Sequence, residues 1–318
     1  MTMRLLITGG AGFVGHRLTQ ALGSQNKYQI IVADAAIPRE KVAGVAYLQL
    51  DLRDSNQTKQ AFVGVDICVN LAAIIGPVGY MAAKPATILR DNALILSSTF
   101  QAAAHHKLKW MIYSSSSMVY QQSTSWPHQE SDLDTTPPPK NIYGFSKLLG
   151  EYFCRAYRQE FDLNYTIVRF FNIYGPGESH YGPDPGFAHV IPDLTRRVLS
   201  GQYPLEIIGD GSQTRAFIHV ADAVNALVAI LDHQDKTQNQ DFNIGTTDEI
   251  TILDLAKKIW QLSGEPRAFK TKTLPEFAHT TQRRVPANTK LTQSTGWQSK
   301  IDLETGLRQV IKDLRTKA

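Results

Sequence analysis

The stretch Thr8-Gly-Gly-Ala-Gly-Phe-Val-Gly15 decides the fold of this 318-residue chain. It follows a short apolar run, Arg4–Thr8, that predicts a β-strand, and it opens a helical pattern over Gly12–Leu22. The first glycine of the Gly-x-x-Gly-x-x-Gly spacing permits a tight turn, the second lets the backbone approach a pyrophosphate, and the third lets the helix pack closely. Backbone N–H groups at the start of the helix then face the phosphates. The stretch therefore predicts a dinucleotide-binding unit.

The first half of the chain alternates short β-branched runs with helical patterns, which indicates βαβ units and a parallel sheet. Further strands are expected at Gln29–Asp34, Tyr47–Leu50, Ile67–Leu71, Trp110–Ser114 and Tyr165–Phe170, and long helices at Pro85–His105 and Tyr143–Phe161. After Asn172 the segment Tyr174–Gly186 is rich in glycine and proline, so we expect a binding loop. The later helices are expected at Val190–Ser200, Ala221–Asp232, Ile252–Ser263 and Leu303–Leu314.

These elements predict an α/β fold: a Rossmann-type doubly wound parallel sheet with a smaller C-terminal α/β substrate-binding domain. We expect the dinucleotide-binding domain to comprise residues 1–172 plus about 216–245. The substrate domain would comprise residues 173–215 and 246–318.

Composition indicates a soluble globular protein with ample length for a core. Lys and Arg number 33 and Asp and Glu 29, so the net charge is +4, spread along the chain. That pattern suits an anionic small ligand and argues against nucleic acid as a partner. Cys68 and Cys154 lack metal-ligand spacing, so we expect buried thiols in a reducing compartment and no metal.

We expect a cytoplasmic protein without a membrane partner. The N-terminus lacks the features of a signal peptide. The longest apolar stretch, Val65–Ala83, is interrupted by Asp66, Asn70 and Pro77 among others, which favours a strand leading into a loop over a membrane span.

Asp34 stands at the end of the second predicted strand, about twenty residues after the glycines. A carboxylate there can accept hydrogen bonds from the adenosine ribose, and it would repel a 2′-phosphate, so NAD is favoured over NADP. Arg39 is close enough in sequence to keep NADP as an alternative. Cofactor contacts are expected at Gly9, Gly12, Phe13, Val14, Gly15, Asp34, Asp51, Leu52, Leu71, Ala72, Ala73, Asn92, Ser114, Tyr143 and Lys147.

Tyr143 and Lys147 lie four residues apart on a predicted helix, so their side chains project from the same face. An ammonium beside a phenol favours the phenolate and draws a pKa of about 10 towards working pH. The pair therefore predicts a base that takes a proton from a sugar hydroxyl while hydride leaves the same carbon.

The chain resembles the extended short-chain dehydrogenases/reductases, the nucleotide-sugar epimerase and dehydratase group, over nearly its whole length. The resemblance rests on TGGAGFVG at 8–15, DLRD at 51–54, NLAA at 70–73, Asn92, SSSSMVY at 114–120, YGFSK at 143–147 and RFFNIYGP at 169–176. It continues through GDGSQTRAFIHVAD at 209–222, FNIGT at 242–246, and RRVPANTKL with GW at 283–297. Gln121 and Ala216 depart from the pattern, where the group has glycine and aspartate.

The resemblance implies catalytic roles for Ser116, Tyr143 and Lys147. Ser116 would bind the reacting sugar oxygen, with Ser115 or Ser117 as alternatives if the register of the four serines slips. Tyr143 would be the acid/base, and Lys147 would lower its pKa and hold the nicotinamide ribose. Substrate contacts are implied at Ser116, Asn172, His189, Val190, Arg215 and Arg283, with Arg284 as an alternative to Arg283.

Met118 narrows the chemistry within the group. Dehydratases place Asp and Glu after the serine, sugar-acid decarboxylases place a glutamate at the Met118 position, and 3,5-epimerases and fucose-synthase-like enzymes place a cysteine there. A thioether cannot move protons. The resemblance then leaves epimerisation at C4, through a transient 4-keto intermediate, or simple 4-keto reduction. Because Asp34 favours NAD and biosynthetic reductases more often use NADPH, we expect NAD-dependent epimerisation of a nucleotide-diphosphate sugar at C4.

Other functions stay open. Ile74–Tyr80 and His189–Pro192 resemble the 3,5-epimerase and fucose-synthase branch, so an NAD(P)H-dependent 4-keto reductase or a 3,5-epimerase/reductase using His189 is the alternative. A catalytically silent NAD-binding member of the group is a further one. The resemblance also implies a homodimer formed through Pro85–His105 and Tyr143–Phe161. It fixes neither the sugar nor the base.

Overall fold

A seven-stranded, wholly parallel sheet organises the computed structural model, which describes residues 2–38, 40–76, 78–178, 188–276 and 281–317. The strand order is β11-β6-β5-β4-β1-β2-β3, so the chain winds outwards in both directions from β1 and β4. The strands are β1 Met3–Thr8, β2 Tyr28–Asp34, β3 Ala46–Gln49, β4 Ile67–Asn70, β5 Trp110–Ser116, β6 Asn164–Phe170 and β11 Gln240–Ile244. The predicted Rossmann-type α/β fold is confirmed.

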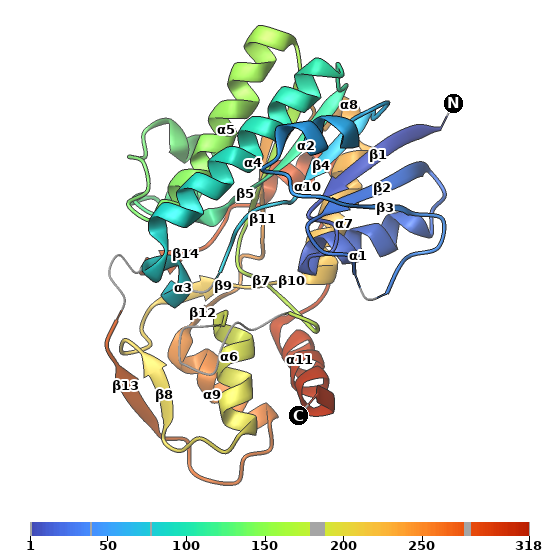
Figure 1. Ribbon diagram of the computed structural model, residues 1–318. Helices are drawn as coiled ribbons and strands as arrows, with labels where there is room; N and C mark the ends of the chain where they lie inside the picture. Colours follow the sequence, from blue (N-terminus) through green and yellow to red (C-terminus); the bar gives the residue numbers. More distant parts are fainter. Residues whose placement is uncertain (1, 39, 77, 179–187, 277–280, 318) are drawn as a thin grey trace.

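Helices cover both faces of this sheet (Figure 1). Helices α1 (Phe13–Gly23) and α7 (Val220–Asp232) pack together on one face, where Leu18 and Leu227 join the core formed with β1 and β4. On the other face lie α2 (Ser55–Ala61), α4 (Pro85–His105) and α5 (Ile142–Phe161). Because both faces are covered, the central strands carry runs of consecutive buried apolar residues, as in β1 and β4.

A smaller helical layer lies beside the carboxyl ends of these strands (Figure 1). Its core joins α6 (Val190–Leu199), α9 (Ile252–Leu262) and α11 (Leu303–Lys317). Three short sheets accompany it: β7 (Ile173–Tyr174) with β10 (Ile218–His219), β8 (Leu205–Ile208) with β13 (Thr271–Leu274), and β9 (Thr214–Ala216) between β12 (Glu249–Thr251) and β14 (Arg283–Arg284).

Several elements differ from the sequence-based expectations. Helix α2 was not predicted, because its sequence is polar and short; its start is fixed by Asp54, whose carboxylate accepts from the N–H groups of Asn56 and Gln57. Strand β11 was not predicted either, since five residues at a sheet edge carry a weak pattern. The remaining short elements are α3 Val78–Ala83, η1 Ser117–Tyr120, η2 Glu130–Asp134, α8 Gln234–Thr237 and α10 Thr289–Thr295.

Strand β5 runs two residues further than expected, to Ser116, and leads directly into η1. The proposed division into two domains stays a prediction. Helix α10, within the second predicted segment of the smaller domain, packs against β11 and α8 of the larger layer. The predicted binding loop Tyr174–Gly186 lies largely outside the described residues.

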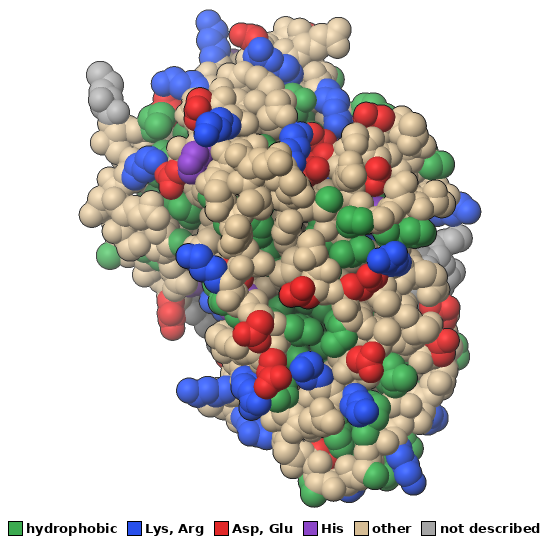
Figure 2. Space-filling view, turned by 180° about the vertical axis from the view of Figure 1, so that it is seen from behind, with side chains coloured by type: hydrophobic (Ala, Val, Ile, Leu, Met, Phe, Trp, Pro, Cys, Tyr) green, Lys and Arg blue, Asp and Glu red, His purple; other side chains and the backbone are tan. Residues whose placement is uncertain are grey.

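Charged side chains of both signs are interspersed over the face in Figure 2, and Lys and Arg do not gather there into one basic patch. Cys68 and Cys154 are buried free thiols, as expected. Among the described residues, none of the helices combines the length and apolar character that crossing a membrane requires.

Candidate active site

The glycine-rich turn between β1 and α1 has the geometry of a phosphate cradle. Gly9 has φ +69°, and a Cβ there would lie 2.8 Å from the amide nitrogen of Ala72. A Cβ on Gly15 would lie 2.3 Å from the carbonyl oxygen of Gly9, so the helix packs as closely as glycine allows. Gly12 is the N-cap residue of α1, which has neither a side-chain cap nor an acidic residue in its first turn. The amides of Phe13, Val14 and Gly15 therefore suit an anion such as the pyrophosphate of NAD.

Asp34 ends β2 beside this turn. Its carboxylate accepts from the amide of Ala11 at 2.9 Å and from that of Ala36 at 3.0 Å. The glycine turn thus orients the carboxylate that is expected to bind the ribose. Leu71, Ala72 and Ala73 follow β4 and are partly buried, with Ala72 directly against Gly9. Arg39, the residue that keeps NADP as an alternative, lies outside the described residues.

Asp51 has its carboxylate engaged by Arg53 at 2.7–3.1 Å. Hydrogen bonds from Arg53 lower the pKa of Asp51. Arg53 also reaches Asp91 of α4 at 2.9 Å, so it ties Asp51, a predicted cofactor contact, to that helix. Leu52 beside it is buried.

Asn92 of α4 connects the loop after β4 to the helix that carries Tyr143. Its side chain accepts from the Ile74 amide at 2.7 Å and donates to the Ile74 carbonyl at 3.1 Å. It also donates to the hydroxyl of Ser146 at 3.1 Å. A small cavity bordered by Ala73, Asn92 and Lys147 lies between these elements. Asn92 therefore holds the cofactor-facing loop in place.

Tyr143 and Lys147 lie on the buried face of α5, and their side chains are 7% and 4% exposed. The lysine Nζ donates to the carbonyl of Ser114 at 2.7 Å and lies 5.8 Å from the Tyr143 ring centroid. Ser116, at the end of β5, hydrogen-bonds to the Tyr143 phenol and caps η1 by accepting from the Met118 amide at 3.2 Å. The three predicted catalytic side chains thus meet at one place.

The pKa values of Tyr143 and Lys147 differ from the expectation that Lys147 lowers the pKa of Tyr143. Burial raises the pKa of Tyr143 above its ordinary value, and the influences that lower it are the hydrogen bond with Ser116 and the charge of Arg284. Burial also lowers the pKa of Lys147 to about 7. Lys147 does not lower the pKa of Tyr143 as expected, because its ammonium is directed at the Ser114 carbonyl. The cation whose charge offsets part of this rise in the pKa of Tyr143 is Arg284.

The two adjacent arginines of β14 face different surroundings, since side chains alternate along a strand. Arg283 is exposed and forms a bidentate pair with Glu249, with both contacts at 2.8 Å. Arg284 points into the site, where its Nη1 lies 3.0 Å from the Met118 sulfur and 3.4 Å from the Ser117 hydroxyl. Of the two alternatives, the structure therefore brings Arg284 to Tyr143.

Arg215 and Asn172 lie together at the junction of the two layers. Arg215 on β9 is buried and donates to the carbonyls of Thr214 at 2.7 Å and Gln282 at 3.3 Å. Burial lowers its pKa well below the usual value, and the charge of Arg284 lowers it further. Asn172 has φ +42° and donates to the Ala216 carbonyl at 2.8 Å. Sequence could not have revealed these backbone partners.

His189 and Val190 stand at the start of α6. The His189 ring contacts the carboxylate of Glu178 at 2.5 Å, with Nδ1 facing the oxygen, and its side chain is 45% exposed. Val190 is partly buried against the core of the smaller layer. Among the described contacts, His189 is joined to Glu178 and not to the Ser116–Tyr143 group.

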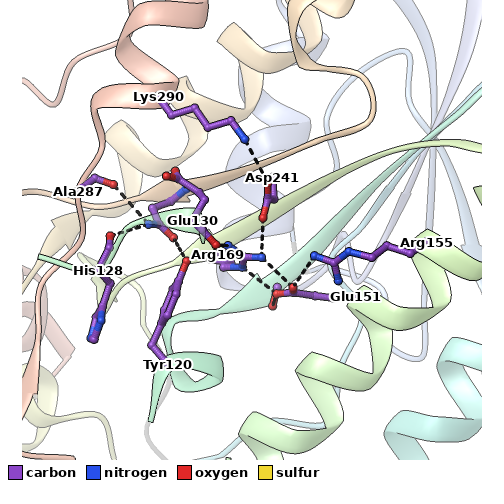
Figure 3. A network of polar contacts seen from close by, with 11 residues as sticks. Tyr120, His128, Glu130, Glu151, Arg155, Arg169, Asp241, Ala287 and Lys290 are labelled. Carbon is purple, nitrogen blue, oxygen red and sulfur yellow. Dashed lines mark hydrogen bonds and ion pairs between the residues drawn. The ribbon is translucent and has the colours of Figure 1, made fainter. Parts of the chain in front are cut away.

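A buried polar network, centred on the Glu151–Arg169 pair, ties the catalytic elements together (Figure 3). Glu151 lies one turn beyond Lys147 and accepts from Ser115 at 2.6 Å and from Arg169 at 2.9 Å. Arg169 on β6 also donates to Asp241 of β11 at 2.6 Å and to the Tyr120 hydroxyl at 2.8 Å. The residue order predicted none of these partners, because five separate elements contribute them.

Gln121, a departure from the family pattern, has a structural role at the catalytic helix. Its side-chain oxygen accepts from the Asn141 amide at 2.8 Å. Asn141 in turn is the N-cap of α5, and its side chain accepts from the Gly144 amide at 3.1 Å. Gln121 thus fixes where the helix that carries Tyr143 begins.

Comparison with known proteins agrees with this geometry. Residues 5–245 match the model of the NAD dependent epimerase/dehydratase family. The chain is 32% identical to a UDP-N-acetyl-alpha-D-glucosaminuronate decarboxylase from Bacillus cytotoxicus, over 99% of this chain and 98% of the relative. It is 28% identical to a dTDP-4-dehydro-6-deoxy-D-allose reductase from Streptomyces bikiniensis, over 98% and 96%.

Solved structures with the same fold include two 4-epimerases. The UDP-glucose 4-epimerase of Thermotoga maritima, with UDP-glucose, superposes with a TM-score of 0.86 at 27% identity, over 99% of each chain. The UDP-glucuronic acid 4-epimerase of Bacillus cereus, with UDP-glucuronic acid and NAD, gives 0.88 at 26%, over 99% of this chain and 100% of the other. With its glycine turn, Asp34 and the buried tyrosine–lysine pair in place, the chain belongs to the NAD-dependent epimerase/dehydratase family of nucleotide-sugar-modifying enzymes.

Proposed function

We propose that this protein epimerises a nucleotide-diphosphate sugar at C4 through a transient 4-keto intermediate. The observation that carries the proposal is the set of side chains around the Tyr143 phenol: Ser116, Arg284 and Met118. The chemistry these groups can support is one proton transfer coupled to hydride transfer. None of the three is a carboxylate or a thiol, the groups expected of a dehydratase, a decarboxylase or a 3,5-epimerase.

Each residue has a role in this proposal. Bound NAD supplies a hydride acceptor at its nicotinamide ring. Tyr143 takes the proton of the C4 hydroxyl, and Ser116 donates a hydrogen bond to the same oxygen. After the keto sugar has rotated in the site to present its other face, Tyr143 returns the proton to the C4 oxygen. General acid–base help of this kind is worth about 10²–10⁴ in rate.

The nucleotide end of the substrate is assigned to the junction of the two layers. Arg215 and Asn172 offer a guanidinium and an amide there, and a guanidinium pairs well with phosphate oxygens. The buried surroundings of Arg215 favour an anionic ligand, because a bound phosphate would offset the cost of keeping that cation out of water.

The second candidate function is a reductase or 3,5-epimerase that uses His189. The reductase relative favours it, and so does the His189–Glu178 contact, which joins the imidazole to a carboxylate at the start of α6. A 4-epimerase regenerates NAD in each cycle, so the purified protein should retain NAD and need none added. A reductase should consume NAD(P)H in proportion to product.

The decisive experiment is a panel of UDP-, dTDP-, GDP- and CDP-sugars followed by NMR of the product. The 4-epimer should form without added cofactor, and Tyr143→Phe should lower kcat by about 10²-fold or more with NAD still bound. Normal turnover by Tyr143→Phe would refute the mechanism. Tight NAD binding with no turnover of any sugar would instead identify a catalytically silent protein.

A homodimer through α4 and α5 is also part of the proposal. The two helices pack side by side, and they expose Leu94 at 44% and Tyr152 at 63% to solvent. Large apolar side chains on a continuous face suit an interface with a second copy. Light scattering should give twice the chain mass, and the Leu94→Glu/Tyr152→Glu protein should give the chain mass; a monomeric wild type would contradict this part.

A further inference from the structure

Arg284 is held in the site without a charged partner. Within the described part of the chain, its guanidinium forms no ion pair, and it contacts the Met118 sulfur and the Ser117 hydroxyl. Its Nε is buried and has no hydrogen-bond partner. A thioether and a hydroxyl at 3.4 Å are poor acceptors for a cation with five N–H donors. The side chain therefore has unused hydrogen-bonding capacity directed at the site.

The cost of this arrangement points to an anionic ligand. Burial lowers the pKa of Arg284 to about 10, which reflects how poorly solvated its charge is. Arg215 lies near enough to repel it. Within the described ranges Arg215 forms no ion pair, and the charge of Glu276 offsets only part of the effect of burial. Two poorly solvated cations that repel each other are costly unless a ligand brings negative charge to both.

In the proposed function the diphosphate of the substrate pairs with Arg215. The negative charge that pairs with Arg284 then comes from another part of the sugar. In a hexopyranose the diphosphate is on C1, across the ring from C4. Tyr143 acts at C4 in the proposed reaction, and Arg284 reaches the same place from β14, where it contacts the two residues after Ser116. Arg284 therefore lies towards the end of the sugar remote from the diphosphate, where C5 carries C6.

We propose that Arg284 binds a carboxylate at C6 of the sugar, so that the substrate class is nucleotide-diphosphate uronates. The inference rests on the proposed function and adds the substrate class. A planar guanidinium with a free Nε and Nη can bind a carboxylate through two parallel hydrogen bonds. A hydroxymethyl group would leave this partly buried charge unpaired. The relatives acting on uronates at 32% and 26% identity are consistent with this chemistry.

The test uses sugars that differ only at C6. With the full-length NAD-bound protein, kcat/KM is measured for UDP-glucuronate and UDP-glucose, or for the same pair on whichever base the panel selects. We expect the uronate to be preferred by about 30-fold or more, the range of a charge-assisted hydrogen-bonded pair. Arg284→Gln should lose most of that preference by acting on the uronate, and Arg284→Lys should keep part of it.

Arg283→Gln is the matched comparison, because it removes an adjacent arginine that is paired with Glu249 at the surface. It should keep the preference for the uronate. Retained NAD and an unchanged circular dichroism spectrum verify that each variant is folded.

The outcomes separate the two proposals. Epimerisation of UDP-glucose at least as fast as UDP-glucuronate by the wild type would overturn the inference and leave the C4 epimerase proposal intact. An equal loss on both sugars in Arg284→Gln would assign Arg284 to the diphosphate and also overturn it. If neither sugar of any base is turned over, the proposed function fails.

Discussion

At the end of β5, three consecutive serines have three different partners. Ser115 donates to Glu151, Ser116 hydrogen-bonds to Tyr143, and Ser117 lies beside Arg284. The sequence left the choice among them open, because four serines in a row carry no register of their own. The strand resolves it by extending to Ser116 and then turning into η1, so that successive side chains point in different directions.

Lys147 gives a prediction of pH-dependent stability. Burial lowers its pKa from 10.5 to about 7 in the folded chain, so the unfolded chain binds more protons between these values. Stability from this group is therefore lowest below about pH 7 and rises with pH through that window. Relative to Lys147→Met, we expect the wild-type free energy of unfolding to increase by on the order of 3 kcal/mol from about pH 6 to 9.5.

Urea unfolding of both proteins at the two pH values measures this difference. Lys290→Met is a suitable control, since Lys290 is partly exposed and paired with Asp241. Parallel pH profiles for wild type and Lys147→Met would contradict the buried-charge interpretation.

Among the elements, α5 carries most of the candidate chemistry, and its N-terminus is set by residues outside the recognised motif. Asn141 caps the helix, and Gln121 from the segment after η1 holds the cap. The periodic pattern predicted the helix and its length to within a residue. It could not predict the cap interaction, since Gln121 is twenty residues away in sequence.

Asn141→Ala should therefore affect both stability and catalysis. Loss of an N-cap side chain lowers the free energy of unfolding by about 1 kcal/mol. Because Tyr143 lies in the first turn of the capped helix, we also expect kcat to fall several-fold with KM little changed. Thr251→Ala removes the cap of α9 in the smaller layer and should reduce stability similarly without the loss in kcat. Identical kinetic effects of the two variants would argue against a positioning role for Asn141.

At the scale of the whole molecule, the buried pair Glu151–Arg169 joins the larger sheet, α5 and the C-terminal segment. Arg169 is fully buried, and its partners lie on α5, η1 and β11. Lys290 of α10 extends the network through Asp241. The same residues that fasten β11 to the sheet thus also steady the strand end that presents Ser116.

Arg169→Met should be strongly destabilising, because it removes the fully buried cation that Glu151 and Asp241 share. Each carboxylate would keep only a partly exposed cation, Arg155 or Lys290. Breaking a buried pair in this way costs about 3–5 kcal/mol, measured as the free energy of unfolding in urea. Glu151→Gln/Arg169→Met should recover part of the loss. Arg308→Met, which removes an exposed pair with Glu304, should cost no more than about 0.5 kcal/mol. A small loss for Arg169→Met would show that water replaces the network.

The amino-acid order by itself determined the parallel sheet, the long helices, the glycine turn and the Tyr143–Lys147 pair. These depend on residues close together in the chain, whose spacing fixes local geometry. Only the tertiary structure decided that Arg284 rather than Arg283 faces Tyr143, that the Lys147 ammonium is directed at Ser114, and that Glu151 meets Arg169. Those contacts join segments far apart in sequence, and burial, which sets their charges and pKa values, exists only once the layers have packed.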